Sequence, residues 1–302
     1  MRKQIFDVKK TSRIVFIGLM TLVPVLNFLV FYVYVNFNSI LMAFQIRNYS
    51  TYTVKYGFQN FKHFFGDIFT TGTVFKSALN NTLIFFSANL FITIPLSILM
   101  CYFIYKKILG FKIFRFFFYL PNIIIGTVTV SLFKNVISSG GPIDALINAL
   151  TGGSIPNLLS NSDNALKTIV FYTIFYSLGG NMILLGGAMN NIDASVIESA
   201  KIDGAGWARE LLNIVLPLIW PTLSVMLLMV SVGLFTASGP ILLFTQGSYN
   251  TYTISYWIYE QMMLGGNLEL ASAIGISLTV IAFPIVYLFK YLLNRTSDRI
   301  GV

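Results

Sequence analysis

The chain has 302 residues, of which 56% are hydrophobic and 10% are charged. A soluble domain carries roughly 25% charged residues, so this composition excludes an ordinary soluble protein and predicts an integral membrane protein. The net charge of +9 does not indicate nucleic-acid binding, because the basic residues stand at the ends of apolar runs, as membrane topology requires. With one cysteine and one histidine, the sequence offers no disulfide pair, metal cluster or cofactor site.

Six apolar runs follow one another along the chain. A helix needs roughly 20 residues to cross the hydrocarbon core of a bilayer. The first run is longer than the core of a signal peptide and no small-residue cleavage site follows it, so it is expected to remain as an uncleaved span. The runs that satisfy the length requirement are 13–35, 77–105, 113–134, 166–190, 218–240 and 270–290.

Lysine and arginine indicate the orientation of these six spans. Most of the 20 basic residues fall in the two terminal segments and in the loops after the second and fourth runs. The positive-inside rule therefore predicts that both termini and the loop 191–217 are cytoplasmic. None of the acidic residues lies well inside a run, which argues against coupling to an ion gradient and suggests another energy source.

The loop 191–217 is charged, although apolar runs flank it. Placing Glu198, Lys201, Asp203, Arg209 and Glu210 in hydrocarbon would cost on the order of 10 kcal/mol, so the loop must lie outside the bilayer core. Its pattern predicts a helix over 194–202 that is capped by Asp193, a tight turn at Gly204, and a second short helix over 206–215. The alternative is an amphipathic linker that lies on the lipid surface.

The spacing within this loop is more specific than its composition. Glu198-Ser199-Ala200, three residues, Gly204, nine residues, Ile214, one residue and Leu216-Pro217 resemble the EAA loop of binding-protein-dependent ABC permeases. Ser199 departs from the usual alanine, one small residue for another. The resemblance implies that this loop contacts a cytoplasmic ATPase, through the coupling residues Glu198, Ser199, Ala200, Asp203, Gly204, Ala205, Ile214, Leu216 and Pro217.

The same resemblance implies the partners. The chain has no G-x-x-x-x-G-K-[ST] phosphate-binding loop, so ATP would be used by a separate subunit. A permease of this family works in the lipid bilayer with a homologous second permease subunit, a cytoplasmic ATPase dimer and an extracytoplasmic solute-binding protein. No nucleic acid is involved.

Further segments resemble the sugar-permease branch of the family, namely 56–65, 77–85, 109–121 and 243–262, although Ser248-Tyr249 replaces the usual Gly-Pro in the last of them. The resemblance implies import of a carbohydrate of oligosaccharide size. A glycerol-phosphate-type polyol is the alternative solute, and an ATP-independent channel or carrier is a further alternative. An intramembrane enzyme is disfavoured, because no nucleophile with a base lies inside a run.

Candidate residues for the solute pathway are polar positions within the fourth and fifth runs. These are Asn181, Thr236, Ser238 and Gly239, and the family resemblance places pathway residues in the same two spans. Hydrogen bonding between helices is the alternative role for these side chains.

We therefore expect an all-α, multi-pass protein of the cell (plasma or inner) membrane, with six transmembrane helices and the type I ABC importer permease fold. Residues 1–74 would form a cytoplasmic segment, the first helix and an extracytoplasmic loop. Residues 75–292 would form the permease core with five helices and the coupling loop 191–217, and residues 293–302 a cytoplasmic tail.

Overall fold

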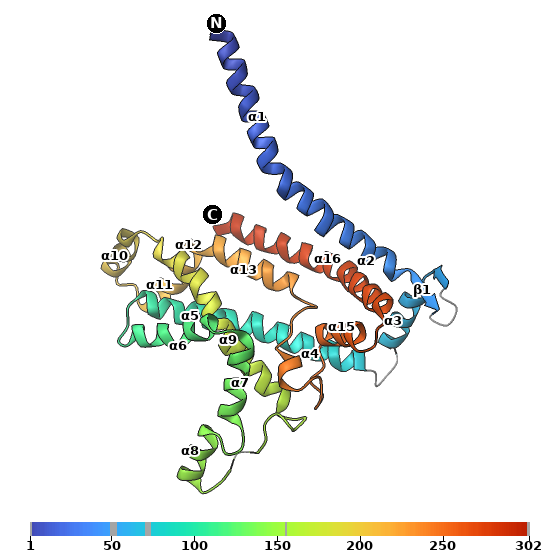
Figure 1. Ribbon diagram of the computed structural model, residues 1–302. Coiled ribbons are helices and arrows are strands. Elements are labelled where there is room, and N and C mark those ends of the chain that lie inside the picture. The colour runs from blue at the N-terminus through green and yellow to red at the C-terminus, as the bar shows by residue number, and fades with distance from the viewer. Residues whose placement is uncertain (1, 49–52, 70–73, 155, 301–302) are drawn as a thin grey trace. The chain divides into compact units, whose positions relative to one another are not determined.

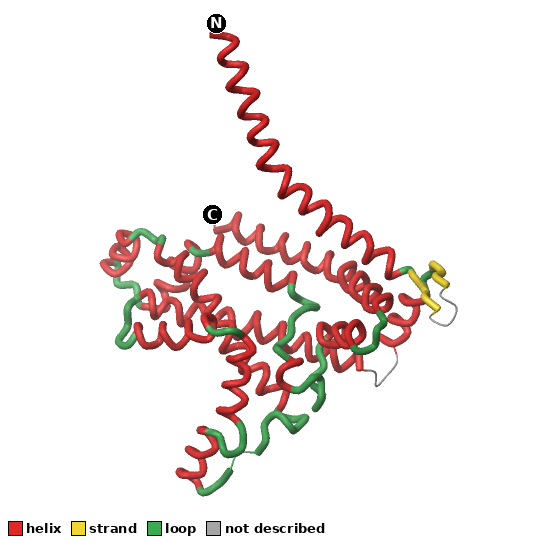
Figure 2. The backbone as a smooth tube through the Cα atoms, in the orientation of Figure 1, coloured by secondary structure: helices red, strands yellow, loops and turns green. Residues whose placement is uncertain are grey.

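The computed structural model describes residues 2–48, 53–69, 74–154 and 156–300. Helices make up most of this part of the chain, and Figure 2 shows that loop concentrates in a few stretches, one of them between α13 and α15. Contacts divide the chain into two compact units, Met1–Gly66 with Gln261–Ser277, and Asp67–Glu260 with Leu278–Val302. Each unit is described in turn.

The first unit begins with a long apolar helix. The stretch Val15–Ala43 could cross a membrane, and none of the residues in its most apolar window is buried within the chain. A helix that is apolar and exposed on every side must contact lipid or another subunit. The elements are α1 (Arg2–Asn27), η1 (Phe28–Tyr34), α2 (Val35–Ala43), β1 (Gln45–Asn48), β2 (Thr53–Tyr56) and most of α3 (Gln59–Phe69).

A small hairpin follows this helix and is fixed by polar side chains. Strands β1 and β2 pair antiparallel, with Gln45 opposite Tyr56. The Asn60 amide donates hydrogen bonds to the carbonyl oxygens of Ala43 (3.0 Å) and Gln45 (2.8 Å). Arg47 Nε lies 3.1 Å from the buried carboxylate of Glu269, at the start of α16 (Leu268–Ile300). These contacts tie the hairpin to the beginning of the last helix.

The second unit is built around α9 (Ala165–Asn190), which packs against α5 (Ile94–Tyr105) and α6 (Phe111–Ile123) (Figure 1). Helix α5 continues α4 (Val74–Ala88) and η2 (Asn89–Thr93), so Val74–Tyr105 is one span. The remaining elements are α7 (Gly126–Ile137), α8 (Pro142–Thr151), α10 (Ala194–Ile202), α11 (Trp207–Glu210), η3 (Leu211–Val215), α12 (Leu216–Leu218), α13 (Trp220–Val232), α14 (Ile241–Phe244) and α15 (Ile254–Met263).

Four of the six predicted spans are continuous helices, and the third and fifth are bent pairs. The third run, 113–134, breaks after Ile123 with a bend of 117°, and Ile124 is extended (φ −86°, ψ 143°). Consecutive β-branched isoleucines before Gly126 give this stretch a low helix propensity. The third predicted span is therefore a bent pair of helices and not one continuous helix.

The fifth predicted span, 218–240, differs from the observed helices at both ends. Trp207–Leu218 and Trp220–Val232 meet at a bend of 77°. Pro221 is in the first turn of α13, where its missing N–H costs no hydrogen bond, whereas it could not continue the preceding helix. The helix then ends at Val232, and residues 233–240 are not helical.

Gly179 allows α6 and α9 to approach closely. A Cβ atom at this position would overlap the Phe118 carbonyl oxygen and the Asn122 side chain. The Asn122 amide in turn donates to the carbonyl of Tyr176 at 3.0 Å.

Candidate functional site

The predicted coupling loop begins with a capped helix that ends in a tight turn. Asp193 accepts a hydrogen bond from the Ser195 backbone N–H at 2.9 Å, which confirms it as the N-cap of α10. Gly204 has φ +74°, in the left-handed region that glycine adopts without strain. Its N–H donates to Lys201 O (3.1 Å), and the next N–H, of Ala205, donates to Ala200 O (3.0 Å). This pair of bonds is a Schellman motif, so the helix stop follows from local sequence.

Helix α10 has one exposed face and one buried face. Glu198, Ser199, Asp203 and Gly204 are exposed, whereas Ala200 is buried. The bond to Ser195 lowers the pKa of Asp193, because a backbone N–H donor favours the carboxylate form. The helix therefore offers a charged, polar surface outward and keeps a small apolar surface inward.

Apolar side chains extend the exposed surface of the loop. Ile202 is 86% exposed and Trp207 is 59% exposed, although both are large hydrophobic residues. Val196 and Leu212 are also exposed. Exposed apolar groups beside charged ones are typical of a surface that a partner protein covers.

The second helix of the loop is anchored by a buried ion pair that the sequence alone did not reveal. Lys106 Nζ, just after α5, lies 2.7 and 2.9 Å from the two carboxylate oxygens of Glu210. The Glu210 side chain is 3% exposed and that of Lys106 is 23% exposed. Lys106 had been interpreted only as part of the positive-inside signal, and the two residues are 104 positions apart.

The loop also shares a hydrophobic core with the spans. Ile197, Leu211 and Val215 are buried in one cluster with Tyr102 of α5 and Met182 of α9. Two further predicted coupling residues, Ile214 and Leu216, pack half-buried against this cluster, and Pro217 is half-buried in α12. Because a close-packed core transmits displacement, a movement of the loop must shift α5 and α9.

Three of the four predicted pathway residues line one cavity of about 310 Å³. Asn181 comes from α9, while Thr236 and Ser238 come from the non-helical stretch after α13. Asn89, in the π-helical turn η2, lines the same cavity and was not predicted. An asparagine within the second apolar run was a signal that could have identified it. None of the described residues around this cavity is charged.

The polar groups of this central cavity are held by their neighbours. The Asn181 amide donates to Ser97 Oγ at 3.3 Å, and the hydroxyls of Ser238 and Thr253 are 2.9 Å apart. Gly239, the fourth predicted residue, does not line the cavity. A Cβ atom there would lie 2.7 Å from Ile169 and 2.8 Å from the Thr173 hydroxyl, so Gly239 allows close packing against α9.

In the described part of the chain, no group of three or more His, Cys, Asp or Glu residues could hold a metal ion. The chemistry available to the loop is contact with a partner protein. The chemistry available to the cavity is hydrogen bonding by amide and hydroxyl groups to a polar molecule.

Comparisons with known proteins agree with this arrangement. Residues 64–298 match the family described as "Binding-protein-dependent transport system inner membrane component". The chain is 29% identical over 295 residues to the polygalacturonan/rhamnogalacturonan transport system permease protein YteP of Bacillus subtilis (strain 168), a match that covers 95% of this chain and 88% of that protein. It is 26% identical over 264 residues to the multiple sugar-binding transport system permease protein MsmF of Streptococcus mutans serotype c, covering 86% and 89%.

A solved structure is also similar. A chain from a bacterial ABC transporter involved in the import of the acidic polysaccharide alginate aligns with a TM-score of 0.81 at 24% identity, covering 95% of this chain and 98% of that one. This likeness confirms the predicted fold class.

Proposed function

The chain belongs to the family of binding-protein-dependent transport system inner membrane components, and on that premise we propose that it is the permease subunit of an ATP-driven carbohydrate importer. Its place in the membrane follows from the family. The proposal concerns its solute, its orientation and its partners.

The single observation that supports this role best is the construction of the coupling loop. The loop exposes Glu198 and Gly204, is anchored through Glu210 to α5, and shares its core with α9. A cytoplasmic ATPase dimer that binds the loop would move both helices when ATP binding closes the dimer. The spans would then alternate between inward-facing and outward-facing states around the central cavity.

The partners and the orientation are part of the proposal. The exposed apolar helix Val15–Ala43 offers a surface for lipid or for a homologous second permease. A related structure was solved in complex with an alginate pentasaccharide-bound periplasmic protein, and we propose that an extracytoplasmic binding protein delivers the solute here too. The coupling loop and both termini would then face the cytoplasm.

The solute is proposed to be an oligosaccharide. Relatives are named for polygalacturonan/rhamnogalacturonan, multiple sugars and arabinooligosaccharides. Another relative is named for sn-glycerol-3-phosphate. The described lining of the central cavity offers amide and hydroxyl groups, which suit the hydroxyl groups of a glycan.

The test is Glu198→Lys in the full transporter, reconstituted in liposomes with its binding protein. We expect ATP-driven uptake to fall at least tenfold and the ATPase to dissociate, because a lysine would reverse the charge of the exposed docking surface. Asp163→Lys, the same type of reversal on an exposed residue before α9, is the matched control. Uptake that is equal in both variants, with the ATPase retained, would refute the coupling role.

A further inference from the structure

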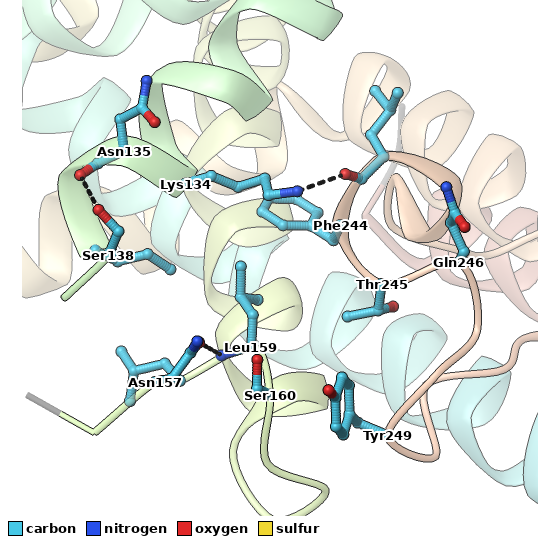
Figure 3. Close-up of a pocket in the computed structure, with 13 residues that line it drawn as sticks. Lys134, Asn135, Ser138, Asn157, Leu159, Ser160, Phe244, Thr245, Gln246 and Tyr249 are labelled. Carbon is cyan, nitrogen blue, oxygen red and sulfur yellow. Dashed lines mark hydrogen bonds between the residues drawn. The ribbon is translucent and has the colours of Figure 1, made fainter.

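A second cavity, of about 490 Å³, lies at the end of α9 opposite the coupling loop. Three segments line this loop pocket, at 134–138, 157–160 and 243–249 (Figure 3). The second of them precedes the start of α9 at Ala165, whereas the coupling loop follows its end at Asn190. An α-helix of that length spans about 39 Å, and the two cavities share no lining residue.

Lys134 gives the loop pocket a positive charge. It is the one charged residue among the described lining residues, none of which carries a carboxylate. Its ammonium group donates to the carbonyl of Leu243 at 3.2 Å, as Figure 3 shows by a dashed line, which leaves two N–H donors for a ligand. An anionic group is therefore the natural partner of this site.

The rest of the lining suits hydroxyl groups. The pocket is also lined by the amides of Asn135, Asn157 and Gln246 and the hydroxyls of Ser138 and Ser160. Tyr249, which is 43% exposed, adds an aromatic ring at the same pocket. A few polar groups with an aromatic wall, in a volume between about 300 and 1,000 Å³, are typical of sites for small ligands.

The wall that carries Gln246 and Tyr249 is strained. Gln246 (φ +51°), Tyr249 (+57°) and Asn250 (+58°) all adopt the left-handed conformation without being glycine. Such residues are uncommon, and they cluster where a structure must hold a functional loop.

Buried contacts hold this strained wall in place. The hydroxyls of Thr245 and Thr251 are 2.6 Å apart, and Thr251 Oγ1 also donates to the carbonyl of Ser248 at 2.7 Å. The buried amide of Asn81, on α4, donates to the carbonyls of Asn250 (2.8 Å) and Tyr252 (2.7 Å). The wall is thus set before a ligand arrives, which lowers the entropic cost of binding.

We propose that the loop pocket binds an acidic sugar residue, a uronate, whose carboxylate contacts Lys134 and whose hydroxyls contact the amides and serines around it. The proposal rests on the proposed function in one respect, that the solute is a glycan. It assigns the recognition of the acidic group to a site remote from the uncharged central cavity.

The test is calorimetric titration of the full transporter in phosphatidylcholine nanodiscs, without ATP, using trigalacturonate and the neutral maltotriose as probes. We expect trigalacturonate to bind at least tenfold more tightly than maltotriose. Lys134→Gln should weaken trigalacturonate binding about tenfold, since it removes a charge-assisted hydrogen bond, and leave maltotriose binding unchanged.

Three further variants test whether the effect is specific to the loop pocket. Lys167→Gln removes the same charge from an exposed position on α9 outside the pocket and should change nothing. Asn135→Ala should also weaken trigalacturonate binding, and it covers the case that Lys134→Gln fails to fold. Asn148→Ala, the same change at an exposed asparagine on α8 outside the pocket, should leave the binding intact.

Equal affinity for the two probes, no binding at all, or equal losses in Lys134→Gln and Lys167→Gln would each overturn the proposal. Because the titration needs no ATP, these results do not depend on the coupling loop. An absence of trigalacturonate binding together with the expected loss of uptake in Glu198→Lys would refute the loop pocket and leave the importer function standing.

Discussion

Lys106 and Glu210 form a two-pronged ion pair, at 2.7 and 2.9 Å, between the end of α5 and the second helix of the coupling loop. The glutamate side chain is 3% exposed, so its charge depends on this one lysine for compensation. We call this ion pair the strut, and we expect it to transmit a movement of the loop to α5.

Lys106→Met tests the strut. It leaves Glu210 charged and buried, and we expect the free energy of unfolding to fall by about 3 kcal/mol. Uptake should fall further than the loss of folded protein explains. The measurements are thermal unfolding in detergent and uptake per folded transporter.

Lys107→Met is the control for the strut, because Lys107 is the adjacent lysine and is exposed. Lys107→Met should leave the free energy of unfolding and the uptake per folded transporter near those of the unchanged protein. If the two variants behaved alike, the ion pair would have no special role.

Gly179 sets the distance between α6 and α9. Gly179→Ala would bring a methyl group against the Phe118 carbonyl, and we expect a loss of about 3 kcal/mol in unfolding free energy, since backbone cannot move aside as a flexible side chain can. Gly187→Ala, on the same helix, has nothing within 4 Å of the new atom and should stabilise the protein by about 0.5–1 kcal/mol. Chemical denaturation of the two variants should therefore give opposite signs, and two changes of the same sign would contradict the packing argument.

Asn181 is the polar group of α9 in the central cavity. Asn181→Leu removes its hydrogen-bonding group there, and we expect uptake to fall about tenfold, because each lost hydrogen bond to the solute contributes about 1 kcal/mol or more. Assembly with the ATPase and its basal hydrolysis should stay normal. Asn148→Leu makes the same change at an exposed position on α8 and is the control. Wild-type uptake in Asn181→Leu would remove this residue from the pathway.

Asp193 caps α10, and the stability that this cap gives to the helix depends on pH only in the acidic range. Its pKa lies below the ordinary 3.8, because the Ser195 N–H donates to the carboxylate. A lowered pKa in the folded state means that the cap stabilises α10 fully above the unfolded-state pKa and loses this effect as the pH falls through the folded-state value. Between pH 6 and 8 the cap should therefore not change.

Hydrogen exchange at neutral pH tests the cap. Asp193→Ala should speed exchange over 194–202, whereas Asp193→Asn, which retains an acceptor, should preserve most of the protection. Asp163→Ala should have no effect on this helix. Unchanged exchange in Asp193→Ala would show that the cap does not hold α10.

Features that depend on neighbouring residues could be predicted from the sequence. The cap at Asp193, the left-handed Gly204 and the helix between them are set within a dozen residues, by turn and capping chemistry that the sequence states directly. The apolar runs could also be identified from the sequence, because each span must match the thickness of the bilayer on its own. The two bent spans were not predicted, since a helix break depends on what packs around it as well as on its own residues.

The sequence by itself therefore determined the membrane class, the spans and the local form of the coupling loop. Only the tertiary structure paired Lys106 with Glu210, brought Asn89, Asn181 and Ser238 to one cavity, and showed why Gly179 must be glycine. These contacts join segments far apart in the chain, and hydrophobic periodicity says which face of a helix is apolar but not which other helix that face will meet.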